Sequence, residues 1–312
     1  MNDDIAIVTE GLSRDFKTVR ALDNLSLEIP RGIVFGFLGP NGAGKTTTIR
    51  LLLGLLEPSQ GRAQVLGLDT RTQAQSIREQ TGALLEHTGL YERLTVEDNL
   101  DFYGRVYHMD PARRRARIQE LLEHLGLWNR RTEPLAGWSR GMKQKAAVAR
   151  ALLHSPRLLF LDEPTAGLDP VAAAALREDL ARLVETERVT VFLTTHNLTD
   201  AERLCRQVAI IRAGKLLAQG SPEELRKRSG GERVEVFGSG FTPELVARLK
   251  SHPEVREVEL VNEHLLVTVQ PGAQFSGITA LLVGAGAAVE DIRRGKTSLE
   301  DAFLDLVEDK TE

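Results

Sequence analysis

One glycine-rich segment constrains the fold of this chain more than any other. Residues 39–46 read Gly-Pro-Asn-Gly-Ala-Gly-Lys-Thr, which fits the phosphate-loop pattern G-x-x-x-x-G-K-[ST]. The preceding apolar run, residues 33–38, is too short for a helix and predicts a buried parallel strand. A helix is expected to begin near Lys45. The pattern therefore stands between a strand and a helix, where a phosphate loop must stand.

This loop pattern predicts a role for each of its residues. Glycines let the backbone curl so that successive N–H groups point at phosphate oxygens, and the following helix adds its positive end. We expect Lys45 to bridge the outer phosphates and the Thr46 hydroxyl to ligate Mg²⁺. A plain glycine turn is the disfavoured alternative. The residues expected to surround the phosphates are Gly39, Pro40, Asn41, Gly42, Ala43, Gly44, Lys45, Thr46 and Thr47.

Two adjacent carboxylates form the second chemical feature. The apolar run 158–161 predicts a buried strand, and it ends in Asp162 and Glu163. Adjacent carboxylates repel each other but are tolerable beside a dication, so we expect Asp162 to ligate Mg²⁺ and Glu163 to orient or deprotonate an attacking water. A solvated strand end with a helix-capping role is the alternative, and the upstream loop disfavours it.

Apolar runs and helical patterns alternate through the first two thirds of the chain. Strands are predicted at 158–161, 189–195 and 208–211, with helices between them, which indicates an α/β fold with a mostly parallel sheet covered on both faces. Residues 6–28 predict two strands of an antiparallel N-terminal layer.

Between these strands lies a segment with a different pattern. Residues 83–155 are expected to be mainly helical, with a break at 133–139, and we place an inserted helical subdomain at about 84–155. Its basic run, residues 113–117, predicts a solvated helix face.

A second, smaller domain is expected after the pair Gly230-Gly231, where period-two strands become dominant. We therefore divide the chain into residues 1–229 and residues 230–312. The order β-α-β-β-α-β-α predicts a small α+β domain with a ferredoxin-like, split-βαβ arrangement. Its strands are predicted at 233–237, 255–261, 265–270 and 289–293, and its helices at 243–250, 277–282 and 299–306.

Composition narrows the partners and the location. With 40 basic and 44 acidic residues among 312, the net charge of −4 gives no footprint for nucleic-acid binding. Cys205 cannot form an internal disulfide and is expected to be a small buried hydrophobe on a helix. The sequence does not open with a charged and then apolar leader, which favours the cytosol. The longest apolar runs fall short of the ~18 residues that span a bilayer, so a membrane partner would be another chain.

Three further segments carry a resemblance to a known family. Residues 138–142, Trp-Ser-Arg-Gly-Met, precede Lys-Gln-Lys; residues 158–170 read LLFLDEPTAGLDP; and His196 follows a strand. In this order they resemble the signature, the second Walker motif with its D-loop, and the switch histidine of ABC transporter ATP-binding subunits, over residues 1–225. The end of the chain, residues 297–303, is similar to the tail of exporter-type subunits that handle drugs, sodium or polysaccharide.

The resemblance implies a P-loop NTPase fold of ABC type and a head-to-tail dimer. Each ATP would lie between the phosphate loop of one copy and the signature of the other, where Ser139 and the N–H of Gly141 would touch the γ-phosphate. His196 would sense that phosphate, and Asp169 would link the two catalytic sites. Phe16 would stack on adenine, with core packing as the alternative for this aromatic. Together with Lys45 and Glu163, His196 completes the expected catalytic set.

The chain departs from the family pattern at three positions. The signature has Arg140 where glycine is usual and Trp138 where leucine is usual. The resemblance places Glu86 at the lid position that is usually glutamine, where it would supply an oxygen near Mg²⁺ and the attacking water. The alternative is a solvent-exposed loop glutamate one or two residues away from the lid position. The segment that follows, Thr88–Tyr107, is expected to receive a cytoplasmic helix of a membrane permease.

These features predict an ATPase subunit that powers export through a separate permease, peripheral on the cytoplasmic face of the membrane. Its expected ligands are ATP and Mg²⁺, and its partners are the permease and a second copy of itself. The alternative is a regulatory or scaffold module that uses ATP-driven dimerisation as a clamp and moves no solute. A ribosome-binding ABC factor is disfavoured because such factors carry two ATP cassettes, whereas this chain contains only one phosphate loop.

Overall fold

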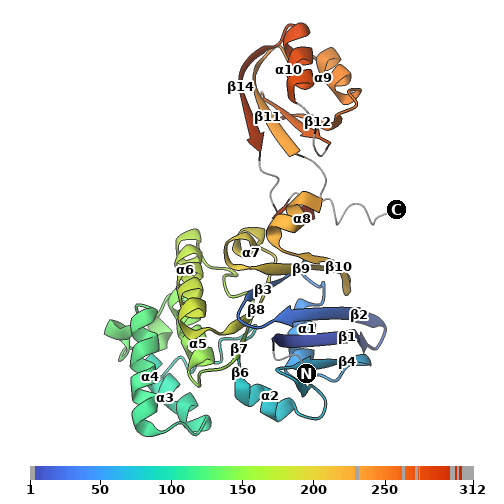
Figure 1. The fold of residues 1–312 in the computed structure, drawn as a ribbon. Coiled ribbons are helices and arrows are strands. Elements are labelled where there is room, and N and C mark those ends of the chain that lie inside the picture. The colour runs from blue at the N-terminus through green and yellow to red at the C-terminus, as the bar shows by residue number, and fades with distance from the viewer. Residues whose placement is uncertain are drawn as a thin grey trace. The chain divides into compact units, whose positions relative to one another are not determined.

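The computed structural model describes residues 4–228, 232–261, 264–270, 273, 275–295, 299–300 and 302–303. The chain separates into two compact units, Met1–Pro222 and Glu223–Glu312 (Figure 1). Each unit has its own hydrophobic core. The division falls shortly before the boundary expected at residues 229 and 230.

A six-stranded sheet forms the centre of the first unit, in the order β10-β9-β3-β8-β7-β6. All neighbours are parallel except β10, which runs antiparallel to β9 at one edge. The carboxyl ends of β3, β7 and β8 therefore meet at the same edge, which confirms the predicted α/β class. The strands are β3 (Val34–Leu38), β6 (Thr81–Leu84), β7 (Leu158–Asp162), β8 (Thr190–Thr195), β9 (Gln207–Arg212) and β10 (Lys215–Gly220).

The helices beside this sheet connect its strands. Between β7 and β8 lies α6 (Pro170–Glu187), and between β8 and β9 lies α7 (Leu198–Leu204). The helix after the glycine-rich loop is α1 (Lys45–Leu52), as predicted, and α2 (Ala74–Gln80) precedes β6.

The expected antiparallel layer is a four-stranded sheet in the order β2-β1-β4-β5. The two long N-terminal strands pair with each other over nearly their full length, from Ile5 opposite Pro30 to Phe16 opposite Val19. The sheet comprises β1 (Ile5–Phe16), β2 (Val19–Pro30), β4 (Gln60–Val65) and β5 (Leu68–Asp69). Only the first two of these strands are predicted from the sequence.

The helical subdomain consists of α3 (Val96–Val106), α4 (Pro111–His124) and α5 (Arg140–Leu152). Two short 3-10 turns, Trp128–Arg130 and Leu135–Gly137, interrupt it at the predicted break. In the view of Figure 1, α3 and α4 lie on one side of the parallel sheet, opposite β1, β2 and β4. The segment 83–155, predicted to be mainly helical, starts with the end of β6, which extends to Leu84, and its first helix begins at Val96.

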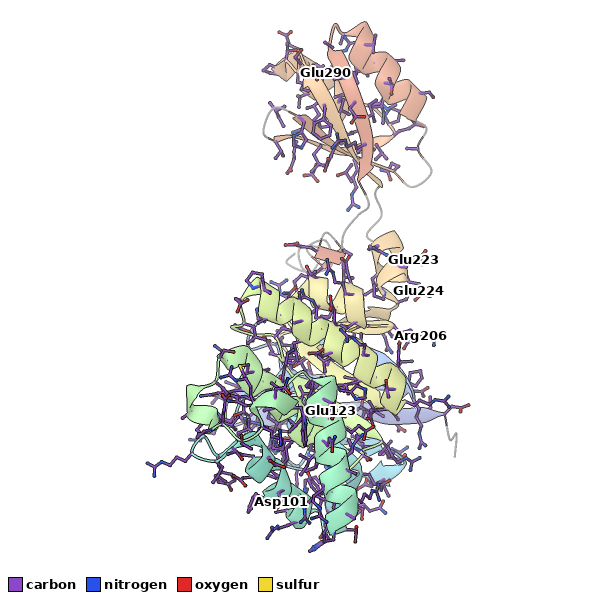
Figure 2. All side chains as sticks on the ribbon, turned by 90° about the vertical axis from the view of Figure 1, so that its left-hand side faces the viewer. Asp101, Glu123, Arg206, Glu223, Glu224 and Glu290 are labelled. Atoms are coloured by element: carbon purple, nitrogen blue, oxygen red, sulfur yellow. The ribbon has the colours of Figure 1, made fainter. Side chains whose placement is uncertain are left out.

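The prediction of a solvated face for residues 113–117 is confirmed for Arg113 and Arg115, which are exposed, but is wrong for two other arginines of the run. Arg114 and Arg117 are buried. Arg114 Nε lies 2.6 Å from Asp101 Oδ1 on α3, a residue labelled in Figure 2. Arg117 Nη1 lies 2.7 Å from Oε1 of Glu187, the last residue of α6. These arginines therefore hold α4 to α3 and to α6.

The second unit has a four-stranded antiparallel sheet in the order β12-β13-β11-β14. Its chain order β-α-β-β-α-β agrees with the split-βαβ expectation. The last predicted helix, residues 299–306, lies largely outside the described residues. The elements are α8 (Pro222–Arg228), β11 (Glu232–Ser239), α9 (Pro243–Lys250), β12 (Val255–Val261), β13 (His264–Val269), α10 (Phe275–Gly284) and β14 (Ala288–Gly295).

Each helix in the described part of the chain is too short or too polar to span a membrane.

Candidate functional site

The glycine-rich loop joins β3 to α1. Gly42 and Gly44 have φ of 80° and 108°, values that favour glycine. A Cβ on Gly44 would lie 2.5 Å from the backbone oxygen of Ala21, so a side chain there would collide. Gly44 also has no side chain with which to cap α1. The first N–H groups of this helix are thus left for another acceptor, which makes the helix start a suitable anion site.

Lys45 has a buried side chain with three acceptors around its ammonium group. Nζ donates to the backbone oxygens of Gly39 and Pro40 at 2.7 and 3.2 Å. It also lies 3.0 Å from Oε1 of Glu163. The lysine is therefore held at the loop and paired with one of the two predicted carboxylates.

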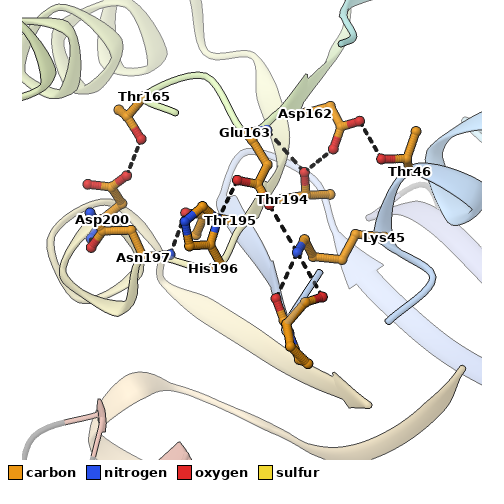
Figure 3. A network of polar contacts seen from close by, with 12 residues as sticks. Lys45, Thr46, Asp162, Glu163, Thr165, Thr194, Thr195, His196, Asn197 and Asp200 are labelled. Atoms are coloured by element: carbon orange, nitrogen blue, oxygen red, sulfur yellow. Dashed lines mark hydrogen bonds and ion pairs between the residues drawn. The ribbon is translucent and has the colours of Figure 1, made fainter. Parts of the chain in front are cut away.

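Asp162 ends β7 with both carboxylate oxygens hydrogen-bonded (Figure 3). Thr46 Oγ1 donates to Oδ2 at 2.7 Å, and Thr194 Oγ1 donates to Oδ1 at 2.5 Å. Thr194 is not among the site residues predicted from the sequence. The available signal was the pair Thr194 and Thr195, which ends an otherwise apolar strand at the edge where the phosphate loop lies.

Glu163 adopts a backbone conformation that is uncommon for a residue with a side chain. Its φ is 49°, and its N–H donates to the backbone oxygen of Thr194 at 3.0 Å. Such conformations persist where the surroundings fix them, and they concentrate at functional sites. The Glu163 carboxylate lies between two groups, since Oε2 is 2.5 Å from Nδ1 of His196 while Oε1 contacts Lys45.

A polar cavity of about 440 Å³ opens beside these groups. A second hollow of about 180 Å³ shares Asn41, Thr46 and Glu163 with it and follows the loop. The cavity is lined by Asn41, Thr46, Arg50, Leu85, Glu86, Arg140, Gln144, Asp162, Glu163 and Ala166. The hollow is lined by Ala21, Asn41, Gly42, Gly44, Lys45, Thr46, Thr47 and Glu163. The predicted magnesium and water-orienting residues and most of the predicted loop residues thus line two hollows that share three residues, whereas the described lining residues do not include Gly39, Pro40 or Ala43.

Glu86, the residue expected at the lid position, lines the cavity. Its carboxylate is 71% exposed and lies 3.7 Å from Nη2 of Arg50. Phe16 ends β1 and is 40% exposed, so the core alternative for this ring is wrong. The Arg14 guanidinium lies 4.7 Å from the ring centroid. Among the described residues, those that line the cavity and the hollow do not include Phe16.

The signature residues stand at the start of α5. Ser139 caps this helix by accepting the N–H of Met142 at 3.3 Å, and Trp138 is buried beside it. A Cβ on Gly141 would lie 3.1 Å from that of Ala172, so the residue packs closely on α6. Of the signature, Arg140 lines the cavity, and the described lining residues do not include Ser139 or Gly141.

Asp169 caps α6. Its Oδ1 accepts the N–H groups of Val171 and Ala172 at 3.0 and 2.9 Å. Its predicted role between two catalytic sites concerns a second copy and stays a prediction.

Cys205 is buried, as expected, but lies one residue beyond α7. Burial raises the pKa of its thiol, and the nearby Asp200 raises it further. The thiol is thus a packing group against β3, where a Cβ on Gly36 would lie 2.8 Å from Sγ.

Comparisons with known proteins match the chain along its length. A family profile described as ABC transporter matches residues 22–166. The daunorubicin resistance ATP-binding protein DrrA3 of Streptomyces coeruleorubidus is 35% identical, over 98% of this chain and 97% of that protein. The bacitracin transport ATP-binding protein BcrA of Bacillus licheniformis is 33% identical, over 96% and 97%. A solved structure, described as the ATP-binding subunit of an ABC transporter, has a TM-score of 0.64 at 32% identity and covers 72% of this chain and 92% of its own.

Proposed function

Because the chain belongs to the family of ABC transporter ATP-binding subunits, we propose that the cavity beside residues 39–46 is its ATP-hydrolysis site. The chain is an ATP-binding and ATP-hydrolysing subunit of an exporter-type transporter. The observation that carries the site is the position of Glu163, with one carboxylate oxygen 3.0 Å from Lys45 Nζ and the other 2.5 Å from His196 Nδ1.

Phosphate binding uses the cation that now pairs with Glu163. The loop N–H groups and the start of α1 attract phosphate oxygens, and Lys45 lies at the same place. A phosphate that recruits Lys45 competes with Glu163 for it and leaves that carboxylate oxygen available to orient water. His196 stays within reach of the same group. A positioned base of this kind is worth about 10²–10⁴ in rate.

Magnesium fits the oxygen atoms beside the loop. The Thr46 hydroxyl and Asp162 Oδ2 lie 2.7 Å apart, and both are the hard oxygen donors that Mg²⁺ prefers. We propose these two residues as its protein ligands, with Glu86 near them. Thr194 holds the other oxygen of Asp162 and so fixes the orientation of the carboxylate. When bound, Mg²⁺ neutralises charge on the transferred phosphoryl group.

A second copy completes the site in this proposal. Ser139 is exposed at the start of a 13-residue helix, whose positive end can act on a phosphate outside its own chain. Gly141 and Asp169 lie close to the same surface of the chain, because a Cβ on Gly141 would contact Ala172, which Asp169 caps. We assign these three residues to the nucleotide of the partner copy in a head-to-tail dimer. Adenine stacking by Phe16 belongs to the same proposal.

The permease contact is assigned to the segment Thr88–Tyr107. Four of its large apolar side chains are 40–55% exposed. They are Tyr91, Leu94, Phe102 and Val106. Exposed apolar patches on a protein surface commonly mark interaction sites. Tyr91 and Phe102 pack edge to face, 5.3 Å between ring centroids. We propose that a permease helix covers this patch at the cytoplasmic face of the membrane.

The two parts of the chain are assigned different roles. Residues 1–229 contain every residue placed in the ATP site, and residues 230–312 are proposed to modulate dimerisation. Each compact unit has a separate core, which supports independent folding. Truncation after Arg228 should therefore leave a folded protein with unchanged ATP affinity. Loss of nucleotide binding in the soluble truncated protein would contradict this assignment.

Glu163→Gln tests the proposed site. The amide keeps the shape of the side chain but cannot act as a base, so ATP binding should persist while turnover falls at least ~100-fold. With ATP and Mg²⁺ the variant should elute as a dimer in size-exclusion chromatography. Glu185→Gln, on the exposed side of α6, is the matched control and should hydrolyse ATP at the parental rate. Parental turnover by Glu163→Gln would overturn the assignment. The names of the relatives, resistance and transport proteins, favour transport over the clamp alternative.

A further inference from the structure

A second set of buried polar contacts lies next to the pair formed by Glu163 and His196 (Figure 3). Its centre is Asp200 on α7, a residue only 1% exposed. One carboxylate oxygen accepts a hydrogen bond from Nη1 of Arg177 at 2.6 Å, and the other accepts the hydroxyl of Thr165. A buried carboxylate is stable only when it is paired and hydrogen-bonded. Asp200 meets both conditions through two other segments of the chain.

Together with the contact between Glu163 and His196, these contacts form a closed ring. Thr165 lies two residues after Glu163, and Asp200 lies four residues after His196. Asn197, which caps α7, accepts the N–H groups of Thr199 and Asp200 at 3.0 and 3.4 Å and so fixes the backbone between His196 and Asp200. The loop after β7 and the turn after β8 are therefore joined twice.

Arg177 ties this ring to α6. Its guanidinium is largely buried and pairs with Asp200, so the ion pair cannot shift without moving the helix. The same helix begins at Pro170, and Asp169 caps it. Thr165 and Asp169 are thus the two fixed ends of one short loop, and the Thr165 hydroxyl is the contact that holds its first end.

We propose that Thr165 and Asp200 are positioning residues for ATP hydrolysis. Their contact holds the loop that bears Glu163 in register with His196, so that one carboxylate oxygen stays on the imidazole while the other exchanges Lys45 for water. Among the described residues, those that line the phosphate cavity and hollow do not include either side chain. They act through Glu163 and His196, and the inference rests on the function proposed for Glu163.

Thr165→Val is the decisive variant, because it removes the hydroxyl, keeps the shape and leaves the ion pair of Asp200 and Arg177 intact. We expect kcat for ATP hydrolysis to fall about 10-fold, equivalent to about 1.4 kcal/mol, with KM unchanged within about twofold. Thr165→Ser keeps the hydroxyl and should retain kcat within about twofold of the parent. Thr199→Val makes the same chemical change at an exposed threonine nearby, whose hydroxyl makes no hydrogen bond to the described residues, and should leave both constants unchanged.

A double-mutant cycle identifies the route. If Thr165 acts through Asp200, Thr165→Val should add almost nothing to the kcat loss of Asp200→Asn. Additive losses would overturn the inference. So would a Thr165→Val protein that has the parental kcat, or one that only melts at a lower temperature or only binds a fluorescent ATP analogue more weakly. If Asp200→Asn does not fold, the Val and Ser variants of Thr165 still decide the question.

The experiment separates this inference from the proposed function. Parental kcat in Thr165→Val together with an inactive Glu163→Gln would overturn the positioning role alone. Parental turnover in Glu163→Gln would overturn the assignment of the catalytic carboxylate, whatever Thr165→Val does.

Discussion

The ammonium group of Lys45 forms an ion pair with Glu163, 3.0 Å from Oε1. The same ammonium donates to two backbone oxygens of the loop, those of Gly39 and Pro40. A bound phosphate would have to compete with these acceptors for the cation. The carboxylate proposed to orient water therefore opposes nucleotide binding until Lys45 leaves it.

This competition predicts that Glu163→Gln binds ATP more tightly than the parent. The neutral amide holds Lys45 less strongly and repels phosphate less, so we expect the Kd to fall about 3- to 10-fold. Equilibrium titration with a fluorescent, non-hydrolysable ATP analogue measures it. Glu185→Gln, which removes one negative charge from an exposed part of α6, should bind as the parent does. An unchanged Kd in Glu163→Gln would contradict the competition.

Arg140 brings a positive charge to the wall of the phosphate cavity. A Cβ on Gly167 would lie 2.2 Å from Nη1 of Arg140, so the guanidinium rests against this glycine, and among the described residues it has no ion-pair partner. We expect Arg140→Ala to weaken ATP binding about 2- to 5-fold at low salt, and the difference to shrink in 0.5 M salt, because the charge is exposed to screening ions. Arg140→Lys should keep most of the affinity. A loss that is the same at both salt concentrations would indicate a packing role.

Loss of the ion pair between Arg117 and Glu187, which joins α4 to α6, should greatly lower the free energy of unfolding. Both side chains are largely buried, and Arg117 also donates to the backbone oxygen of Leu152 at 3.2 Å. Arg117→Met leaves Glu187 without this partner and should lower the free energy of unfolding by about 3 kcal/mol. Arg115→Met, on the exposed side of the same helix, should change it by less than about 0.5 kcal/mol. Urea unfolding followed by circular dichroism compares the two variants, and equal effects would contradict the role of the ion pair.

His154 makes the free energy of unfolding depend on pH. Its ring stacks on Tyr107 with 3.9 Å between centroids, and its Nε2 lies 3.1 Å from the backbone oxygen of Thr81. Burial lowers the pKa of this histidine, and the charge of Arg150 lowers it further. When the pH falls through the ordinary histidine range, the unfolded chain takes up a proton that the folded chain does not, so folding stability is lost as the pH falls.

Replacing His154 should remove this contribution. We expect the free energy of unfolding of His154→Gln to depend less on pH between 7.5 and 5.5 than that of the parent, although the variant is less stable at pH 7.5 because the ring stack is lost. Urea unfolding at several pH values gives the slope. His124→Gln, at an exposed site, is the control and should keep the parental slope. A parental slope in His154→Gln would show that another group carries the acid sensitivity.

The groups that could be predicted from the sequence are those whose chemistry is written into a local pattern. The phosphate loop and the carboxylates at 162 and 163 follow from a few consecutive residues between a strand and a helix. Contacts between distant segments could not be predicted in this way. Arg117 finds Glu187 on another helix, and Thr194 reaches Asp162 from the neighbouring strand. The strand β6 likewise has only four residues, too few to show the alternating pattern of a strand, and it is recognised by its pairing with β7.

Substitutions of Glu86 test how a carboxylate at the lid position affects the Mg²⁺ requirement of the ATPase. Glu86 lines the cavity together with Thr46 and Asp162, and its only ion pair among the described residues is the long one with Arg50, 3.7 Å. A carboxylate there attracts a dication more than an amide would. Glu86→Gln should therefore remain an active ATPase but need about 2- to 5-fold more Mg²⁺ for half-maximal activity. Glu86→Ala, which offers no oxygen, should lose permease-stimulated turnover more than basal turnover. Steady-state ATPase rates, titrated with Mg²⁺ with and without the permease, measure both effects, with Glu185→Gln as the charge control. Parental magnesium dependence in Glu86→Gln would mean that Glu86 does not act at the lid position.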